Sequence, residues 1–130
     1  MKILIADPDW RFTQRASRYL ESLAHLVVCQ SQADQALERA KSWKPDLVIV
    51  DTELAENGLI ESIHQLRPRP AVLLTGWMDR YDRVWRAWQR GGDELLMKPV
   101  FKSAQLHQAI VAALENAAAG TRHVPQVASA

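Results

Sequence analysis

Four reactive side chains follow short apolar runs in this chain, and their types suit the chemistry of phosphoryl groups. Asp7 follows KILIA, Asp51 follows DLVIV, Thr75 follows AVLL, and Lys98 follows ELLM. Runs of this kind, without polar alternation, are typical of parallel strands buried on both faces. Ligands of open α/β sheets bind beyond the carboxyl ends of such strands. We therefore expect the two acids, the hydroxyl and the amine to meet in one site.

The chemistry that this site suggests is transfer of a phosphoryl group to Asp51. Lys98 would pair with the charge of the acyl phosphate as a point cation, and Thr75 would donate a hydroxyl hydrogen bond to a phosphoryl oxygen. The transfer also needs a divalent cation, because attacker and donor are both anionic. Mg²⁺ prefers one or two carboxylates together with water and phosphate oxygens. The expected metal ligands are Asp7 and Asp51, with Asp9 and Glu53 as the further acids available.

Strand-like and helix-like segments alternate along the whole chain. The strands are expected at residues 2–6, 25–30, 46–50, 71–74 and 94–97. Helical spacing follows Asp9 to Leu23, spans 32–43, follows Gly58 up to Pro68, and runs from about 79 to 91 and from 103 to 119. Strict alternation predicts an α/β fold, a doubly wound parallel sheet with right-handed crossovers and helices on both faces.

Size and composition fit one ordinary globular domain. The chain has 130 residues, 48% hydrophobic and 24% charged, and a net charge of +1 that gives no argument for nucleic acid or an anionic membrane. No apolar run approaches the ~18–20 residues that span a bilayer. The single cysteine, Cys29, fits a reducing cytoplasm and is expected to be a small buried residue. We predict a cytoplasmic domain over residues 1–119, with no room for a second one, and a flexible tail over 120–130.

The chain resembles the receiver domain of bacterial two-component response regulators over nearly all of residues 1–119. The segments that carry the resemblance are KILIAD, PDLVIVD, the later Gly58, LLTG and GGDELLMKPV. The resemblance implies a flavodoxin-like, five-stranded sheet of order 2-1-3-4-5. It assigns Asp51 as the phosphoacceptor and Asp7 as the first residue of an acidic pair. It assigns Thr75 and Lys98 as the switch hydroxyl and the phosphate-binding lysine.

Several positions near the site depart from the family's pattern. Pro8 stands where the family has a second acid that binds magnesium directly, and Asp9 lies one residue further on. Asp9 either turns into the metal site or caps the next helix, and its residue type favours the cap. Glu53 either assists metal binding or repels phosphate and pairs with Lys98. Leu95 replaces a switch aromatic and cannot reproduce the rotamer swing of an aromatic ring.

The segment after Thr75 is rich in aromatic and arginine residues. Trp77 either overhangs the site or is a partly buried loop aromatic. Tyr81, Trp85 and Trp88 recur at helical spacing with arginines around them. One interpretation is purely structural and places all three side chains in the hydrophobic core. The other makes them a partner face, because tryptophan, tyrosine and arginine are enriched in binding hot spots, and because this helix helps form the face for dimers and partners in the receiver family.

Our first hypothesis is a phosphorylation switch that is not an enzyme beyond assisting its own phosphorylation and dephosphorylation. A sensor histidine kinase or phosphotransfer protein would donate to Asp51 with Mg²⁺ present. Movement of Thr75 would then shift the face formed by the fourth helix, the fifth strand and the fifth helix, which is also a route to a homodimer. Neither a nucleic acid nor a membrane is expected as a partner of this domain by itself.

Two alternatives belong to other functional classes. The first is a degenerate receiver that is not phosphorylated and works as a protein-interaction module, since Pro8 removes a metal ligand. The second is a phosphatase whose motif begins with two aspartates separated by one residue, as in residues 7–9. The following Trp10 and Arg11 do not fit that motif, and Asp51 would have no role in it.

Overall fold

The computed structural model describes residues 1–122 and contains every strand and helix that the sequence predicts. The strands are β1 (Lys2–Ala6), β2 (Leu26–Gln30), β3 (Leu47–Asp51), β4 (Ala71–Trp77) and β5 (Glu94–Lys98). The α-helices are α1 (Trp10–Ser22), α2 (Ala33–Trp43), α3 (Leu59–His64), α4 (Tyr81–Arg90) and α5 (Ser103–Ala119). Short 3₁₀ turns at Glu56–Gly58 and Met78–Arg80 precede α3 and α4.

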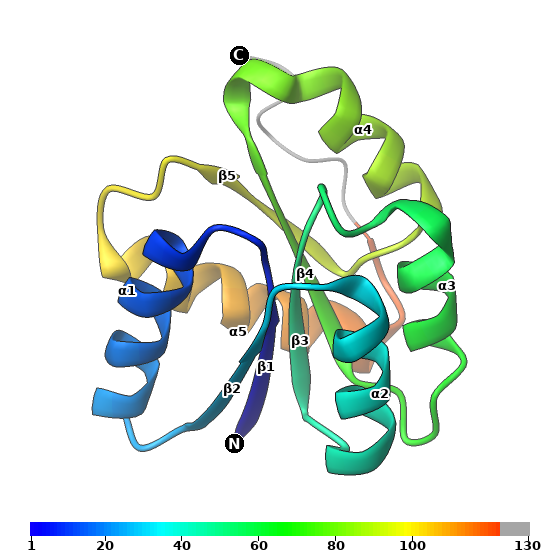
Figure 1. Ribbon diagram of the computed structural model, residues 1–130, viewed down its shortest axis with the longest axis horizontal. Coiled ribbons are helices and arrows are strands. Elements are labelled where there is room, and N and C mark those ends of the chain that lie inside the picture. Colours follow the sequence, from blue (N-terminus) through cyan, green and yellow to red (C-terminus); the bar gives the residue numbers. More distant parts are fainter. Residues whose placement is uncertain (123–130) are drawn as a thin grey trace.

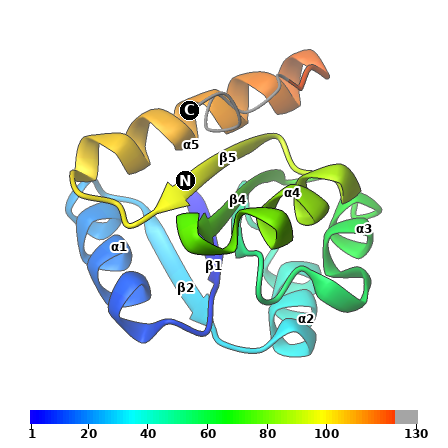
Figure 2. The ribbon, with the colours of Figure 1, turned by 90° about the horizontal axis from the view of Figure 1, so that it is seen from above.

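The five strands form one parallel sheet between two layers of helices (Figure 1). The strand order is β2-β1-β3-β4-β5, which confirms the predicted doubly wound topology. Seen from above, α1 and α5 cover one face of the sheet, and α2, α3 and α4 cover the other (Figure 2). Because all five strands are parallel, their carboxyl ends lie along the same edge.

Two hydrophobic cores hold the layers together, and alternate side chains of each central strand enter different cores. Ile3 and Ile49 pack under α1 and α5, whereas Leu4 and Val48 pack under α2 to α4. All four side chains are fully buried. Central strands that are buried on both faces explain the continuous apolar runs in the sequence.

The strand β2 lies at the edge of the sheet, where the expectation of full burial is wrong. It pairs only with β1 among the described residues, its Leu26 side chain is 63% exposed, and Cys29 is exposed too. The apolar run of an edge strand looks like that of a central strand in sequence, because both reflect β propensity.

The strand β4 extends to Trp77, beyond its predicted end at residue 74. It continues because its last residues still pair with β5, with Trp77 opposite Lys98. Gly76 allows α4 to pack closely against this end of β4, since a Cβ atom there would overlap the side chain of Val84 in α4. The helix α4 therefore begins only at Tyr81, after a 3₁₀ turn.

The aromatic stripe of α4 is divided between the core and the surface. Trp88 is only 6% exposed and packs in the core with Leu74 and Ile60 as fellow members of its cluster. Trp85 is partly buried against the same cluster, and Tyr81 is exposed. Trp88 therefore does not lie on an exposed partner face, as one sequence interpretation had it. The reason is that helical spacing alone leaves the rotation of α4 on the sheet undetermined.

The residues directly after α5 are attached to the fold. Thr121 donates its backbone N–H to the carbonyl of Asn116 at 3.0 Å. Arg122 donates its Nε–H to the carbonyl of Gly92 at 2.8 Å, and its guanidinium lies 4.0 Å from the centroid of the Trp88 ring. The flexible tail predicted for 120–130 thus starts with three ordered residues, and residues 123–130 lie outside the described part. None of the helices formed by residues 1–122 has the length and apolar character to cross a bilayer.

Candidate functional site

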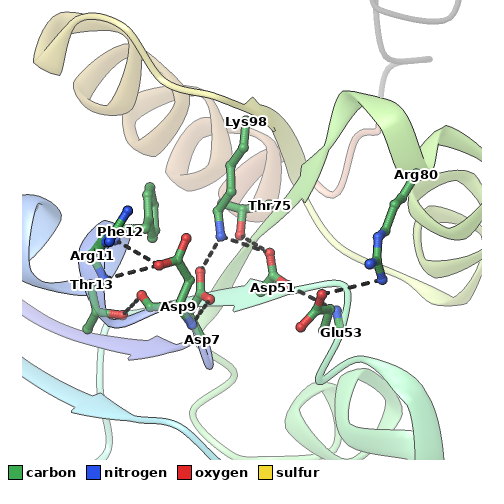
Figure 3. Close-up of polar contacts among 10 residues, drawn as sticks. All are labelled: Asp7, Asp9, Arg11, Phe12, Thr13, Asp51, Glu53, Thr75, Arg80 and Lys98. Atoms are coloured by element: carbon green, nitrogen blue, oxygen red, sulfur yellow. Dashed lines mark hydrogen bonds and ion pairs between the residues drawn. The ribbon is translucent and has the colours of Figure 1, made fainter.

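The structure brings the four predicted side chains together at the carboxyl edge of the sheet (Figure 3). Asp7 directly follows β1, Asp51 ends β3, Thr75 lies on β4 and Lys98 ends β5. None of the four is more than 2% exposed. The arrangement follows from strand register, since Asp51 lies directly opposite Thr75 in the β3–β4 pair.

The ammonium group of Lys98 lies between two carboxylates. Its Nζ atom is 2.6 Å from Asp7 Oδ2 and 3.0 Å from Asp51 Oδ1. The hydroxyl of Thr75 donates to the same Asp51 oxygen at 3.2 Å. The other oxygen of Asp51 accepts the backbone N–H of Glu53 at 3.1 Å. The two oxygens of Asp51 are therefore unequal, with Oδ1 shared by two donors and Oδ2 by one.

The site carries more negative than positive charge when both acids are ionised. Burial, and after it the nearby charge of Asp51, raise the pKa of Asp7 from 3.8 to about 6. The hydrogen bond and charge of Lys98 oppose this shift, as does the N–H of Asp9, but they do not cancel it. One lysine thus neutralises only one of two carboxylates, and an added cation would be stabilised here.

Asp9 caps α1 and is not part of the buried cluster. Its Oδ1 accepts the backbone N–H groups of Arg11 at 3.0 Å and Phe12 at 3.4 Å. The backbone N–H of Asp9 itself donates to Asp7 Oδ1 at 2.8 Å. Of the two roles open for Asp9, the structure shows the cap, while its backbone N–H orients Asp7.

Glu53 contributes its backbone to the site, while its side chain points to the opposite side of Asp51 (Figure 3). Its carboxylate lies 3.6 Å from the guanidinium of Arg80, in an exposed ion pair. Glu53 therefore does not pair with Lys98, as one sequence interpretation proposed. The ion pair also connects the loop after β3 to the residue that precedes α4.

Two aromatic rings flank the Lys98 ammonium. Its Nζ atom is 4.4 Å from the centroid of the Phe12 ring and 5.5 Å from that of Trp77. Trp77 thus does lie over the site, on β4 rather than in a loop. Neither Phe12 nor Arg80 was predicted from sequence to lie at the site. The available signal for Phe12 was its place in the first turn of a helix that starts at the site.

The donor set fits a magnesium ion held by few protein ligands. Across residues 1–122, no three His, Cys, Asp or Glu side chains converge as a preformed metal cluster. Asp7 and Asp51 do share one cation between them, and two carboxylates with water and phosphate oxygens are a sufficient set for Mg²⁺. Pro8 supplies no side-chain ligand, and Asp9 and Glu53 are directed elsewhere.

Comparison with known proteins identifies the family. A model of the response regulator receiver domain matches residues 3–111. The alkaline phosphatase synthesis transcriptional regulatory protein PhoP of Bacillus subtilis (strain 168) is 30% identical over 102 residues, which are 75% of this chain and 42% of that protein. The probable transcriptional regulator ycf27 of Guillardia theta is 29% identical over 128 residues, 95% of this chain and 50% of that protein. The chain spans between two-fifths and half of these relatives.

Solved structures share the fold. A response regulator receiver domain protein from Clostridium thermocellum matches with a TM-score of 0.74 and 24% identity, over 92% of this chain and 98% of that one. NtrX from Brucella abortus, solved in complex with ADP, matches with a TM-score of 0.80 and 24% identity, over 92% of this chain and 27% of that one.

Proposed function

Because this chain belongs to the response regulator receiver domain family of two-component signalling, we propose that Asp51 accepts a phosphoryl group and that the domain transmits this event to a partner. The observation that carries the proposal is the position of the Lys98 ammonium, which is buried and shared between Asp7 and Asp51. A buried lysine that binds the acceptor carboxylate is already in place to bind the oxygens of an acyl phosphate.

The proposed reaction is attack of an Asp51 carboxylate oxygen on the phosphorus of a phosphohistidine. Oδ2 is the less committed oxygen, since it accepts only a backbone N–H. A P–O bond forms, the P–N bond breaks, and its electron pair returns to the imidazole nitrogen, which takes up a proton. Lys98 and Thr75 then stabilise the phosphoryl oxygens by charge and by a hydroxyl hydrogen bond.

Receiver domains generally bind Mg²⁺ in an acidic pocket, and in this chain the ion would be held by Asp7 and Asp51. When bound, the metal would offset the negative charge that accumulates between the carboxylates and the phosphoryl group. Support comes from the two buried carboxylates, which share the single Lys98 ammonium and so leave one negative charge unpaired when both are ionised. The capping role of Asp9 argues against the phosphatase alternative, because that motif needs two acids in the reaction site.

Receiver domains of response regulators interact with histidine kinases or phosphotransfer proteins, and we propose such a cytoplasmic donor for this chain. The proposed output face comprises α4, β5 and α5, which is also where a homodimer would form. Within α4, Tyr81 is exposed and Trp85 is partly buried. The hydrogen bond of Thr75 to Asp51 supports a switch here, because phosphorylation would change the partner of that hydroxyl.

Beryllofluoride, which mimics a bound phosphoryl group, tests the proposal through tryptophan fluorescence. With millimolar Mg²⁺, we expect a saturable fluorescence change, because the Trp77 ring lies 5.5 Å from the Lys98 ammonium that contacts Asp51. The variant Asp51→Asn removes the acceptor carboxylate and should abolish the change. Trp77→Phe should reduce the signal and so identify its source.

Asp9→Asn is the matched control, because asparagine also caps helices and the cap is kept. We expect this variant to respond to beryllofluoride like the natural chain. A response that persists in Asp51→Asn would contradict the proposal. An absent response in the natural chain would favour a receiver that is not phosphorylated and works as an interaction module.

A further inference from the structure

A cavity of about 570 Å³ opens beside the phosphoacceptor site, between α1 and the segment that joins β5 to α5. Pockets that bind small organic molecules have volumes of roughly 300–1,000 Å³ and apolar walls with a few polar groups. The cavity reaches the site through Lys98 and Trp77, whereas Asp51 is not among its lining residues. A molecule in the cavity would therefore contact Lys98 and Trp77 but not Asp51.

Aromatic rings form much of the wall. Phe12 and Tyr19 line the cavity from α1, and Trp77 lines it from the end of β4. At the rim, Trp10 is 66% exposed. Burial of a tryptophan side chain is more favourable than that of most side chains, because its apolar area is large. Rings contributed by different elements favour a planar aromatic guest, which can stack on one ring and meet the edge of another.

The polar groups of the wall are mainly cationic. Arg11 and Arg15 lie one helical turn apart on α1, so both line the same side of the cavity. Within residues 1–122, neither guanidinium takes part in an ion pair. Asp9 is the one acid of the lining, and its Oδ1 is engaged by the helix cap. Two adjacent guanidinium groups suit a carboxylate or a phosphate, which each can bind in bidentate fashion.

We propose that this cavity binds a small aromatic anion, a planar ring that carries a carboxylate or a phosphate. The ring lies among Phe12, Tyr19 and Trp77. The anionic group contacts Arg11 and Arg15, away from the negative charge of Asp7 and Asp51. A ligand of this size in a partly open cavity has an expected dissociation constant on the order of 10–100 μM.

Isothermal titration calorimetry of the full chain with two pairs of probes tests the proposal and identifies the anion. Indole-3-acetate and its neutral amide form the carboxylate pair, and AMP and adenosine form the phosphate pair. We expect saturable binding of at least one anion, with its neutral counterpart at least about tenfold weaker, since the charge-assisted bonds are lost. The pair that responds distinguishes a carboxylate ligand from a nucleotide.

The double variant Arg11→Gln/Arg15→Gln should weaken binding of the anion at least about tenfold. Both side chains are exposed, so the fold does not depend on them. Arg18→Gln is the matched control, because Arg18 is also exposed on α1 but does not line the cavity. Asp51→Asn should retain binding, which separates this proposal from the phosphorylation of Asp51. Three results would overturn it: no saturable binding up to about 1 mM of any probe, equal binding of neutral and anionic probes, or unchanged binding in the double variant.

Discussion

Two sets of ion pairs meet at Asp51 and the loop that follows it, and they differ in burial far more than in chemistry. On one side, Lys98 lies within 3.0 Å of both Asp7 and Asp51, and none of these side chains is more than 2% exposed. On the other side, Arg80 and Glu53 are 3.6 Å apart, with 54% and 38% of their side chains exposed. Breaking a buried pair leaves an uncompensated charge, whereas water screens an exposed one.

This difference separates the part of the site that must stay fixed from the part that can move. The buried ion pairs of Lys98 fix the position and charge of Asp51. The exposed set connects the β3–α3 loop to α4, where Arg83 and Glu56 form a second exposed pair at 3.7 Å. Exposed pairs contribute about 0–1 kcal/mol each. We expect α4 to be tethered weakly enough to respond to chemistry at Asp51.

The largest effect is expected from removing the buried cation. Lys98→Met leaves two carboxylates buried side by side, and its free energy of unfolding should fall by about 3–5 kcal/mol at pH 7.5. Urea denaturation monitored by circular dichroism measures this. The loss should be smaller at pH 5, where Asp7 is protonated and one of the two negative charges disappears.

The exposed Lys102 provides the control for that experiment. Lys102→Met should change the free energy of unfolding by less than about 0.5 kcal/mol. If Lys98→Met were tolerated as well as Lys102→Met, the contrast between buried and exposed pairs would be wrong.

The second effect concerns the pH dependence that Asp7 imposes. Its pKa is about 6 in the folded chain and 3.8 as the reference value, so the folded state binds the proton more tightly. The stability that this proton contributes is complete below pH 4 and is lost as the pH rises through 6. Two pKa units correspond to roughly 3 kcal/mol. Relative to Asp7→Asn, the natural chain should therefore lose up to that amount between pH 4 and 7.

Unfolding curves of both proteins at several pH values give this difference directly. Parallel pH profiles would show that Asp7 ionises as easily in the folded chain as in the unfolded one. Added Mg²⁺ should reduce the loss at pH 7 in the natural chain, since a cation favours the ionised carboxylate.

A smaller effect is expected at Gly76, where α4 meets the sheet by close packing rather than by charge. In Gly76→Ala the new Cβ atom would overlap the Val84 side chain and lie 3.0 Å from Thr52 Oγ1. Val84 is fully buried and β-branched, so it has little freedom to turn away. Overpacking of this kind costs about 1–3 kcal/mol, measurable by thermal or urea unfolding. A change in the free energy of unfolding below about 0.5 kcal/mol would show that α4 can move away from the sheet at little cost.

The smallest effect is expected from the exposed pair. Glu53→Gln should change the free energy of unfolding by less than about 1 kcal/mol, and the change should shrink further in high salt. Denaturation at low and high ionic strength measures both. A loss comparable with that of Lys98→Met would place Glu53 in the buried network instead.

The fold and the four central side chains are predictable from sequence for a common physical reason. Central strands are apolar on both faces, so their ends are visible as the first reactive residues after each run, as at Asp7 and Asp51. Strict alternation of strands and helices then brings those ends to one edge. The cap at Asp9 was also foreseeable, because aspartate before a helix usually binds free N–H groups.

The remaining features depend on how elements pack, which periodicity does not encode. Burial of Trp88 depends on the rotation of α4, and exposure of Cys29 depends on β2 lying at an edge. The pairing of Glu53 with Arg80 requires the extension of β4 and the 3₁₀ turn that follows it. The cavity beside Lys98 is lined by α1 and the β5–α5 segment, so it depends on how these elements are placed relative to each other.

The central claim is that Asp51 is the phosphoacceptor, and intact-mass spectrometry after incubation with acetyl phosphate and Mg²⁺ tests it most directly. The natural chain should gain the mass of one phosphoryl group, and Asp51→Asn should gain none. A natural chain that stays unmodified, or an Asp51→Asn variant that is modified to the same extent, would contradict it.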